Sequence, residues 1–240
     1  MINKETDNCR ILSILVILIV SSILHSCGLF DSNDKDDNEQ SIVDDFPIDM
    51  IEDLQIVEFE VGSDHRGVVN SWIILLLDKK HEKVSLVING KDVSLLKEGE
   101  LDGKMEYTGS FDFLPKDELE YELSLDNNTF SGSLLVPNFL EIECPPEFDF
   151  ESDFILNWTI DSDPDIFYSY IELYGSGISY FEDRLVSGDQ RSDTFEKSIY
   201  ESYSTNDLSV QIGAYPFNYI FTEDIIFITR SHVEFSECRY

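Results

Sequence analysis

Beyond about residue 50, apolar and polar residues follow one another in short runs whose spacing is typical of β-strands. Residues 57–61 read Val-Glu-Phe-Glu-Val, and this strict alternation predicts a strand with one buried and one solvent-facing side. Residues 72–77 are apolar without a break, so both faces of that strand should be covered by protein. The pattern therefore predicts strands in more than one kind of position within a sheet.

Asn89 and Gly90 mark a predicted hairpin. They separate the apolar-rich runs 84–88 and 91–95, and an Asn-Gly pair supplies the two positive φ angles that a type I′ turn requires. Similar runs continue to the end of the chain, so the protein is expected to be all-β. The further strands that the pattern predicts are 105–113, 121–125, 129–136, 139–143, 154–160, 168–174, 208–212 and 225–235.

The first half of this β-rich region resembles an immunoglobulin-like sandwich. Leu114-Pro115 is followed by Tyr121 at the opening of an alternating strand. This arrangement is similar to the tyrosine corner of immunoglobulin-like and fibronectin type III domains, in which the Tyr hydroxyl bonds to backbone just upstream. The resemblance implies an antiparallel β-sandwich over residues 49–138.

The second half resembles a fibronectin type III domain. Residues 154–160, with Trp158, and the tyrosine-rich residues 168–174 resemble strands B and C of that family. At the corner where the family has a Tyr, this chain has Leu208. The resemblance implies a second antiparallel β-sandwich over residues 139–240, and it implies an architecture without a particular function.

An apolar run near the N-terminus, residues 11–24, has the length of a signal-peptide core. It holds 14 residues, whereas a membrane-spanning helix needs roughly 20, and Arg10 stands at its entry. The run ends in Leu24-His25-Ser26-Cys27, which resembles the lipobox of bacterial lipoproteins. That family implies a signal peptide over residues 1–26 and a lipid on Cys27, which would hold the protein to a membrane. The alternative is an uncleaved signal anchor.

Residues 27–48 are expected to form a disordered acidic tether. They hold seven acidic residues against one base, Lys35, and little in them can be buried. The residue after the lipid cysteine is Gly28 rather than Asp, which favours the outer membrane by the usual sorting rule. The acidic run also resembles the export signal of surface lipoproteins, so display at the cell surface and a plain periplasmic spacer both stay open.

The charge of the chain narrows its partners. It carries 49 acidic and 16 basic residues, for a net charge of −33 at pH 7. A surface of this sign repels nucleic acid and anionic headgroups, so a nucleic-acid partner is not expected.

Cys144 and Cys238 remain for pairing once Cys9 leaves with the signal peptide and Cys27 carries the lipid. An exported protein meets an oxidising compartment, in which these two can form a disulfide that encloses 94 residues. In the sandwich that the resemblance implies, they lie near the end of the first strand and after the last, and these ends are neighbours. Two separate thiols are the alternative. No Cys-x-x-Cys pair occurs, so a structural zinc site is not expected.

Asp161, Asp163 and Asp165 form a weak candidate for a calcium loop, since acidic oxygens at alternate positions are ligands that calcium prefers. Ile166 stands where the sharp turn of an EF-hand needs Gly, and Pro164 stiffens the loop. The other interpretation is a solvated loop between strands. No metal or other cofactor is therefore expected.

Four aromatic residues at alternate positions, Tyr215, Phe217, Tyr219 and Phe221, would share one face of an extended strand. Three interpretations are open: a core face, a platform on which a glycan stacks, and a contact between the two domains. Pro216, within the run, favours a loop or an edge strand over a central strand.

No motif of a nucleophile, phosphate loop or histidine metal site occurs after Cys27. The sequence therefore predicts a non-enzymatic lipoprotein that serves as a binding, adhesion or spacer module for a glycan or protein partner. One alternative is an accessory substrate-binding subunit of an outer-membrane uptake system. Another is a hydrolase whose site the sequence does not reveal.

Overall fold

A computed structural model of the chain describes residues 54–64, 66–78, 81–101, 103–175, 178–201, 209–222, 224–233 and 237–240. The predicted signal peptide (1–26), Cys27 and the acidic tether (27–48) lie outside these residues, as does Leu208. Anchoring and processing therefore stay predictions.

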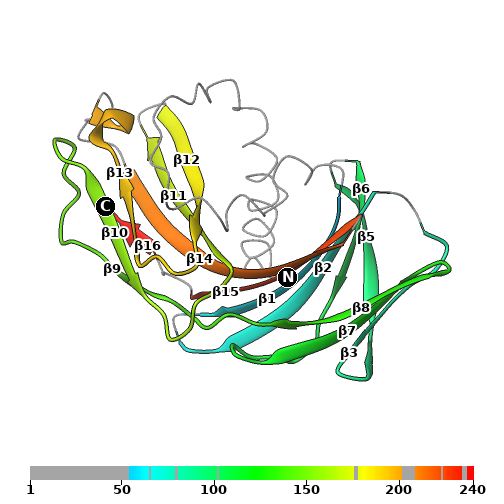
Figure 1. The fold of residues 1–240 in the computed structure, drawn as a ribbon. Coiled ribbons are helices and arrows are strands. Elements are labelled where there is room, and N and C mark those ends of the chain that lie inside the picture. Colours follow the sequence, from blue (N-terminus) through cyan, green and yellow to red (C-terminus); the bar gives the residue numbers. More distant parts are fainter. Residues whose placement is uncertain are drawn as a thin grey trace.

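The described strands form one large sheet and two small sheets (Figure 1). The large sheet runs β12 (Ile178–Ser187), β11 (Ile166–Gly175), β14 (Ser209–Thr222), β15 (Ile225–Val233), β1 (Gln55–Ser63), β2 (Val69–Leu77), β6 (Lys104–Gly109) and β5 (Leu95–Leu101), with β16 (Glu237–Arg239) paired to β14. The first small sheet is β4 (Lys91–Val93), β3 (Val84–Ile88), β7 (Glu118–Leu125) and β8 (Asn128–Leu135). The second small sheet is β13 (Ser192–Phe195), β10 (Phe154–Thr159) and β9 (Glu141–Glu143), and a short 3₁₀ helix, η3 (Lys197–Ile199), follows β13. The all-β fold class is confirmed.

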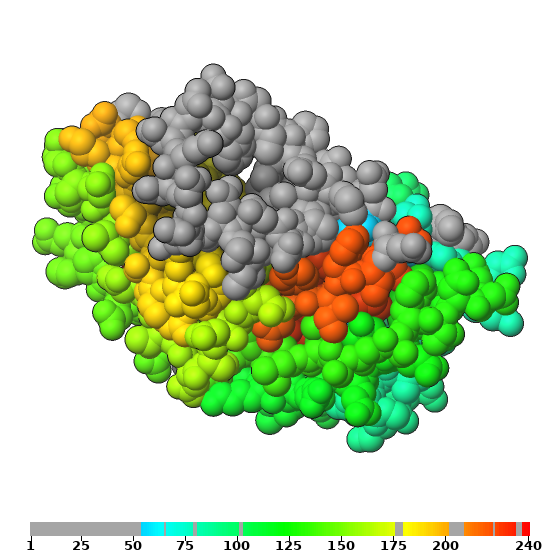
Figure 2. All heavy atoms as spheres, viewed as in Figure 1, coloured from blue at the N-terminus to red at the C-terminus, as the bar shows by residue number. Residues whose placement is uncertain are grey.

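The large sheet joins the two predicted sandwiches. β15, near the C-terminus, lies between β14 and β1 and pairs with β1 in parallel over nine residues, from Gln55 opposite Ile225 to Ser63 opposite Val233. The other pairings between described strands are antiparallel. In Figure 2, orange-red atoms of β15 accordingly lie against green atoms of the first half at the surface. The domain boundary between residues 138 and 139 stays a prediction. The sequence predicts two separate sandwiches, and it does not predict that they share one sheet.

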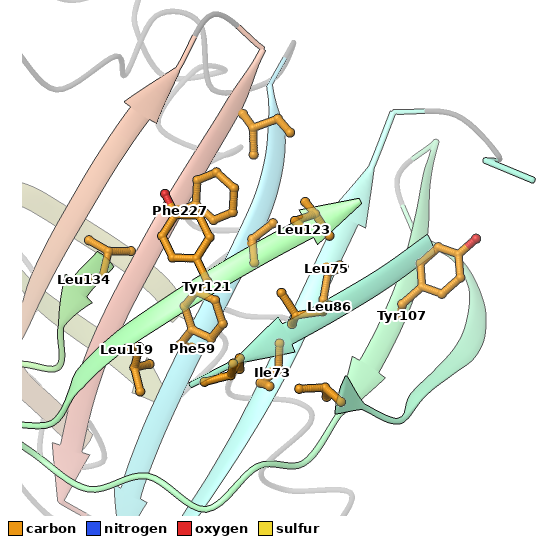
Figure 3. Close-up of a cluster of buried hydrophobic side chains, with 14 of the residues drawn as sticks. Phe59, Ile73, Leu75, Leu86, Tyr107, Leu119, Tyr121, Leu123, Leu134 and Phe227 are labelled. Atoms are coloured by element: carbon orange, nitrogen blue, oxygen red, sulfur yellow. The ribbon is translucent and has the colours of Figure 1, made fainter. Parts of the chain in front are cut away.

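Two hydrophobic cores lie between the large sheet and the small sheets. The first core packs the large sheet against the first small sheet, and it includes Ile225 and Phe227 of β15, both fully buried. Phe227 stacks on Tyr121 of β7 with ring centroids 4.1 Å apart, and Phe59 lies beside this pair (Figure 3). The second core packs the large sheet against the second small sheet around Trp158. β15, which belongs to the second half of the sequence, thus completes the core of the first sandwich.

The segment between the halves is fastened to the shared sheet by side chains. Asn218 and Thr229 each donate a hydrogen bond of 2.7 Å to the backbone oxygen of Leu135, and Ser231 donates one of 2.7 Å to the oxygen of Asn138. All three donors are buried polar residues that find partners in this way. The two halves are therefore held by specific bonds as well as by strand pairing.

The prediction that the strand around residues 57–61 is half-buried is wrong. β1 is buried on both sides along most of its length, and the side chains of Glu58 and Glu60 are only 3% and 1% exposed. The alternation still separates two faces: Val57 and Phe59 enter the first core, while the two glutamates face the opposite side, where Arg230 of β15 pairs with them. Charged residues can occupy a buried face when such a partner is present.

Other strand predictions hold. β2 buries both faces as its apolar run predicts, and Asn89 and Gly90 take φ angles of 49° and 73° in the β3–β4 hairpin. The predicted strand 91–95 instead divides between sheets, because the chain leaves the first small sheet after Val93 and enters the large sheet at Leu95.

Pro216 lies inside a long central strand, contrary to the loop or edge that it predicts. β14 pairs with β11 as far as Phe217 along one edge. Along its other edge, β16 pairs with residues 211–213 and β15 pairs with residues 217–222. Pro216 falls in the interval between these two partners. A residue without a backbone N–H is tolerated there, because no described strand pairs with that edge at this point.

The corner hydrogen bond is made by Tyr200 rather than by the predicted Tyr121. Tyr200 donates to the backbone oxygens of Phe195, 3.2 Å away, and of Ser152, 2.6 Å away. Within the described residues, Tyr121 makes no such bond to upstream backbone, and it is buried in the first core instead. The resemblance at the corner thus appears in the second half, on a residue that the sequence pattern did not indicate.

Cys144 and Cys238 form a disulfide, with 5.3 Å between their Cα atoms. Cys144 follows β9, and Cys238 lies in β16, opposite Ile212 of β14. The bond therefore fastens the end of the chain to the first strand of the second half.

Replacing both cysteines by serine should lower the free energy of unfolding by about 2–4 kcal/mol, because the unfolded chain regains the freedom that a closed loop denies it. Urea denaturation of the double variant measures the loss. Wild-type protein in reductant is the control and should fall to the same value, and an unchanged midpoint in the double variant would contradict the expectation.

Candidate functional site

The large sheet is curved, and its concave face lies on the side away from the small sheets (Figure 1). This face carries a third cluster of side chains. All members of this cluster come from strands of the large sheet, apart from Leu54, which directly precedes β1. The described residues supply no second sheet over this face. The hydrophobic cores of both halves are therefore complete without the side chains of the concave face. The residues of this third cluster need a separate explanation.

A strip of aromatic and ionisable side chains crosses the concave face from β2 to β11. Trp72 Nε1 donates to Glu60 Oε2 at 2.9 Å, and Glu60 Oε1 lies 3.1 Å from His232 Nδ1. The His232 ring meets the edges of Trp72 and Tyr215, at centroid distances of 5.9 and 6.3 Å. Tyr215 stacks on Tyr170 at 5.7 Å, with 3.2 Å between their hydroxyl oxygens. We call this connected set the polar strip.

Two glycines make room for the polar strip. A Cβ on Gly213 would lie 2.8 Å from the Tyr170 ring, and one on Gly62 would lie 2.7 Å from the His232 ring. Each glycine is in a strand, where the side chain of any other residue would occupy the space that the neighbouring ring takes. The absence of a side chain at these two positions thus allows the Tyr170 and His232 rings to lie close to the backbone of the sheet.

Arg230 is the cation that pairs with Glu60 of the polar strip. Its guanidinium forms ion pairs with Glu58 and Glu60, and all three side chains are almost fully buried. Burial raises the pKa of Glu58 to about 7 even though Arg230 opposes it. Burial acts on Glu60 in the same direction, but Arg230 and His232 outweigh it and lower the pKa of Glu60 to about 2. Both carboxylates are held by Arg230, so the cluster is an ion-pair network rather than a free acid–base pair.

These pKa shifts predict that the cluster stabilises the fold most at mildly acidic pH. Glu60 adds stability as pH rises from about 2 to the ordinary 4.5, because the unfolded chain still binds the proton that the folded protein has released. Glu58 removes stability from 4.5 to about 7, because there the folded protein retains a proton that the unfolded chain has lost. Urea midpoints at about pH 5 and about pH 8 should therefore differ more in wild type than in Glu58→Gln. Equal pH dependence of the two proteins would contradict the assignment.

At Tyr170, the polar strip adjoins polar side chains of β12, β14 and β16. Tyr170 donates a hydrogen bond of 2.7 Å to Glu237 Oε2, and Gln211 Nε2 donates to the same carboxylate. Asp183 lies opposite Tyr170 in the β11–β12 pairing, and burial raises the pKa of its carboxyl group to about 6. This end therefore combines tyrosine rings with acidic oxygens.

The aromatic run of β14 divides between the cluster and the solvent. Tyr215 and Phe217 are buried members of the concave cluster, and Tyr219 packs against it. Phe221 is 37% exposed and does not belong to the cluster. The structure thus brings three of the four predicted side chains into one cluster, beside groups that the sequence pattern did not indicate.

The missed members are ionisable residues from distant strands: Glu58, Glu60, Tyr168, Tyr170, Asp183, Arg230 and His232. One signal in the sequence could have found four of them. Residues 58–60 read Glu-Phe-Glu, with an acidic residue at every second position of a β-like run. Residues 230–232 read Arg-Ser-His, with a basic residue at every second position of another such run. Such a period puts each pair on one face of its strand, where the pairs could meet.

The predicted calcium loop does not gather its carboxylates. Asp161 accepts hydrogen bonds from Lys116 at 2.8 Å and from Asn138 at 3.1 Å, while Asp163 pairs with Arg191. Asp165 accepts from the backbone N–H of Tyr219 at 2.8 Å. Each carboxylate is thus occupied by a different protein group.

Among the residues that the structure describes, no group of three or more His, Cys, Asp or Glu side chains is placed to hold a metal ion. None of the helices found in the same residues is long and apolar enough to cross a membrane.

No protein-family model matches the chain, and no curated protein matches it. Three solved structures are similar in part. They are the chicken CNTN1 FN1–FN3 domains (12% identity, TM-score 0.29, 77% of this chain and 62% of that one), Titin-A168169 (9%, 0.23, 74% and 96%) and the Yersinia pseudotuberculosis adhesin InvE (7%, 0.21, 75% and 60%). This chain spans less than two thirds of the CNTN1 and InvE chains. With TM-scores this low, the three structures determine neither the fold nor the function, and the fold class rests on the strand pairing described above.

Proposed function

We propose that the protein is a non-enzymatic lipoprotein of the bacterial outer membrane, held by lipid on Cys27, and that its concave face binds a glycan. The observation that carries the proposal is the polar strip, in which Trp72, His232, Tyr215 and Tyr170 connect across neighbouring strands. It combines large apolar surfaces with hydrogen-bonding groups on a face that neither small sheet covers. That combination is typical of ligand sites.

A glycan suits the polar strip better than a purely apolar partner. Sugar rings offer apolar faces to aromatic side chains and hydroxyls to polar ones, and both kinds of group alternate here. The indole N–H of Trp72, the hydroxyls of Tyr170 and Tyr215 and the carboxylate of Glu237 lie among the rings. An acidic tether of residues 27–48 would keep this face away from the membrane while Cys27 holds the chain.

Calorimetry with purified residues 28–240 and a panel of oligosaccharides tests the binding proposal. Tyr219→Ala removes a ring that packs in the concave cluster, and it should weaken binding by about tenfold, or 1.4 kcal/mol. Phe221→Ala, on the same strand but outside the cluster, is the matched control and should leave affinity unchanged. Absence of binding to every saccharide, or equal losses in the two variants, would refute the proposal.

Metabolic labelling with palmitate tests the anchor separately. The full chain should incorporate label and fractionate with the outer membrane, and Cys27→Ser should abolish the label and release the protein. Continued labelling of Cys27→Ser would refute the lipobox assignment without touching the binding proposal.

A further inference from the structure

The aliphatic end of the concave face is buried, although no described strand covers it. Ile56 of β1 pairs with Leu76 of β2 and with Ile226 of β15, and all three belong to the concave cluster. Leu76 and Ile226 are only 1% and 0% exposed. The described residues supply no second sheet over this face, and an aliphatic side chain on an uncovered sheet face keeps its outer end in water. Another part of the chain therefore covers this end.

The chain enters the aliphatic end at Leu54. This residue is 3% exposed, belongs to the concave cluster and is the first residue that the structure describes. The stretches outside the description that follow β2, β5 and β14 at this end are residues 79–80, 102 and 223, which hold at most two residues each. The residues that precede Leu54 form the longer stretch, so they are the candidate for the cover.

Residues 46–51 have the pattern that such a cover requires. They read Phe-Pro-Ile-Asp-Met-Ile, and Phe46, Ile48 and Met50 would share one side of an extended segment. An extended chain spans about 3.5 Å per residue, so Phe46, eight residues before Leu54, reaches up to about 28 Å from it. Neighbouring strands lie about 4.8 Å apart, so this reach extends across the concave face to the polar strip.

The point of entry is held by a base. Lys104 of β6 donates a hydrogen bond to the backbone oxygen of Leu54, and the two residues before Leu54 in the sequence are the acids Glu52 and Asp53. Opposite charges attract at this point. A segment that is bonded to the face has an effective concentration on the order of millimolar, so weak apolar contacts suffice to hold it there.

We propose that residues 46–51 dock on the concave face of the same chain and compete there with the external ligand. Their apolar side covers the aliphatic end around Ile226, and the segment extends toward the polar strip. The competition rests on the proposed function, because it assumes that a glycan binds this face, whereas the docking does not depend on it. A ligand that displaces the segment adds its residues to the tether that leads to Cys27.

Nile red, an uncharged dye that binds exposed apolar surface, tests the docking with residues 28–240. The double variant Ile48→Asp, Met50→Asp puts two charges on the apolar side of the segment, so it should uncover the aliphatic end and raise dye fluorescence several-fold. The double variant Leu29→Asp, Phe30→Asp makes the same change in charge elsewhere in the tether and should give the wild-type signal.

A synthetic peptide of residues 44–53 separates docking from unfolding. Added to Ile48→Asp, Met50→Asp, it should bind the uncovered face and return dye fluorescence toward the wild-type level. The same peptide with the two aspartates should have no effect. Displacement by the first peptide alone requires an intact face, so it also shows that the variant is folded.

Calorimetry with a saccharide that binds residues 28–240 tests the competition. Ile48→Asp, Met50→Asp should bind it several-fold more tightly than wild type, and Leu29→Asp, Phe30→Asp should bind it as wild type does.

The outcomes separate the two proposals. A wild-type dye signal in Ile48→Asp, Met50→Asp, an equal rise in the control variant, or a peptide that displaces no dye would overturn the docking. Equal saccharide affinity of wild type and Ile48→Asp, Met50→Asp would overturn the competition. If the peptide binds and no saccharide binds either protein, the proposed glycan function falls and the docking stands.

Discussion

A fragment that contains only residues 49–138 is expected to remain largely unfolded, although it spans the whole first predicted sandwich. β15 supplies Ile225 and Phe227 to the core of that sandwich and covers the edge of β1. Without β15, Glu58 and Glu60 also lose Arg230. Circular dichroism and urea denaturation should show no cooperative transition for the fragment, whereas residues 49–240 should unfold cooperatively.

A pair of single substitutions in the full chain tests the same dependence without truncation. Phe227→Ala should lower the free energy of unfolding by about 3–5 kcal/mol, because its ring is fully buried against Tyr121 in the first core. Phe221→Ala, in the same hairpin but exposed, should change it by no more than about 0.5 kcal/mol. A stable fragment 49–138, or a negligible effect of Phe227→Ala, would show that the N-terminal sandwich folds independently of β15.

Arg230→Met should destabilise the protein by about 3–5 kcal/mol near neutral pH. The side chain is 1% exposed and neutralises Glu58 and Glu60, so its loss leaves carboxylates buried without their cation. The free energy of unfolding from urea denaturation measures the loss. The triple variant Glu58→Gln, Glu60→Gln and Arg230→Met removes the charges together and should recover part of it. A loss below about 1 kcal/mol in the single variant would mean that Arg230 is not the cation that these carboxylates require.

The strands could be predicted from the sequence because each one depends on local pattern. The unbroken apolar run of β2 predicts that both faces of this strand are buried, and the Asn89-Gly90 pair predicts positive φ angles in a turn. The structure confirms both predictions. The shared sheet could not be predicted in this way, because it depends on pairing between strands that are far apart in the sequence. Glu60 and Arg230 are 170 residues apart, and a period of two shows which face a side chain takes without showing which strand lies beside it.

The candidate site was predictable only where it consisted of apolar residues. Alternation along β14 placed Tyr215, Phe217 and Tyr219 together, as the structure does. Tyr170 and Asp183 were hidden because their roles depend on which strands become neighbours. Glu58 looked like a solvent-facing residue in an alternating strand, and only the arginine brought by β15 makes its burial possible.

The fluorescence of Trp72 provides the most direct test of the concave face as a ligand site. The chain has two tryptophans: Trp72 on the polar strip and Trp158 fully buried in the second core. Adding the saccharide that binds in calorimetry should change the emission of wild type and of Trp158→Phe, and it should leave the emission of Trp72→Phe unchanged. A ligand-dependent change that persists in Trp72→Phe, or a bound saccharide that alters neither tryptophan, would contradict binding at the polar strip.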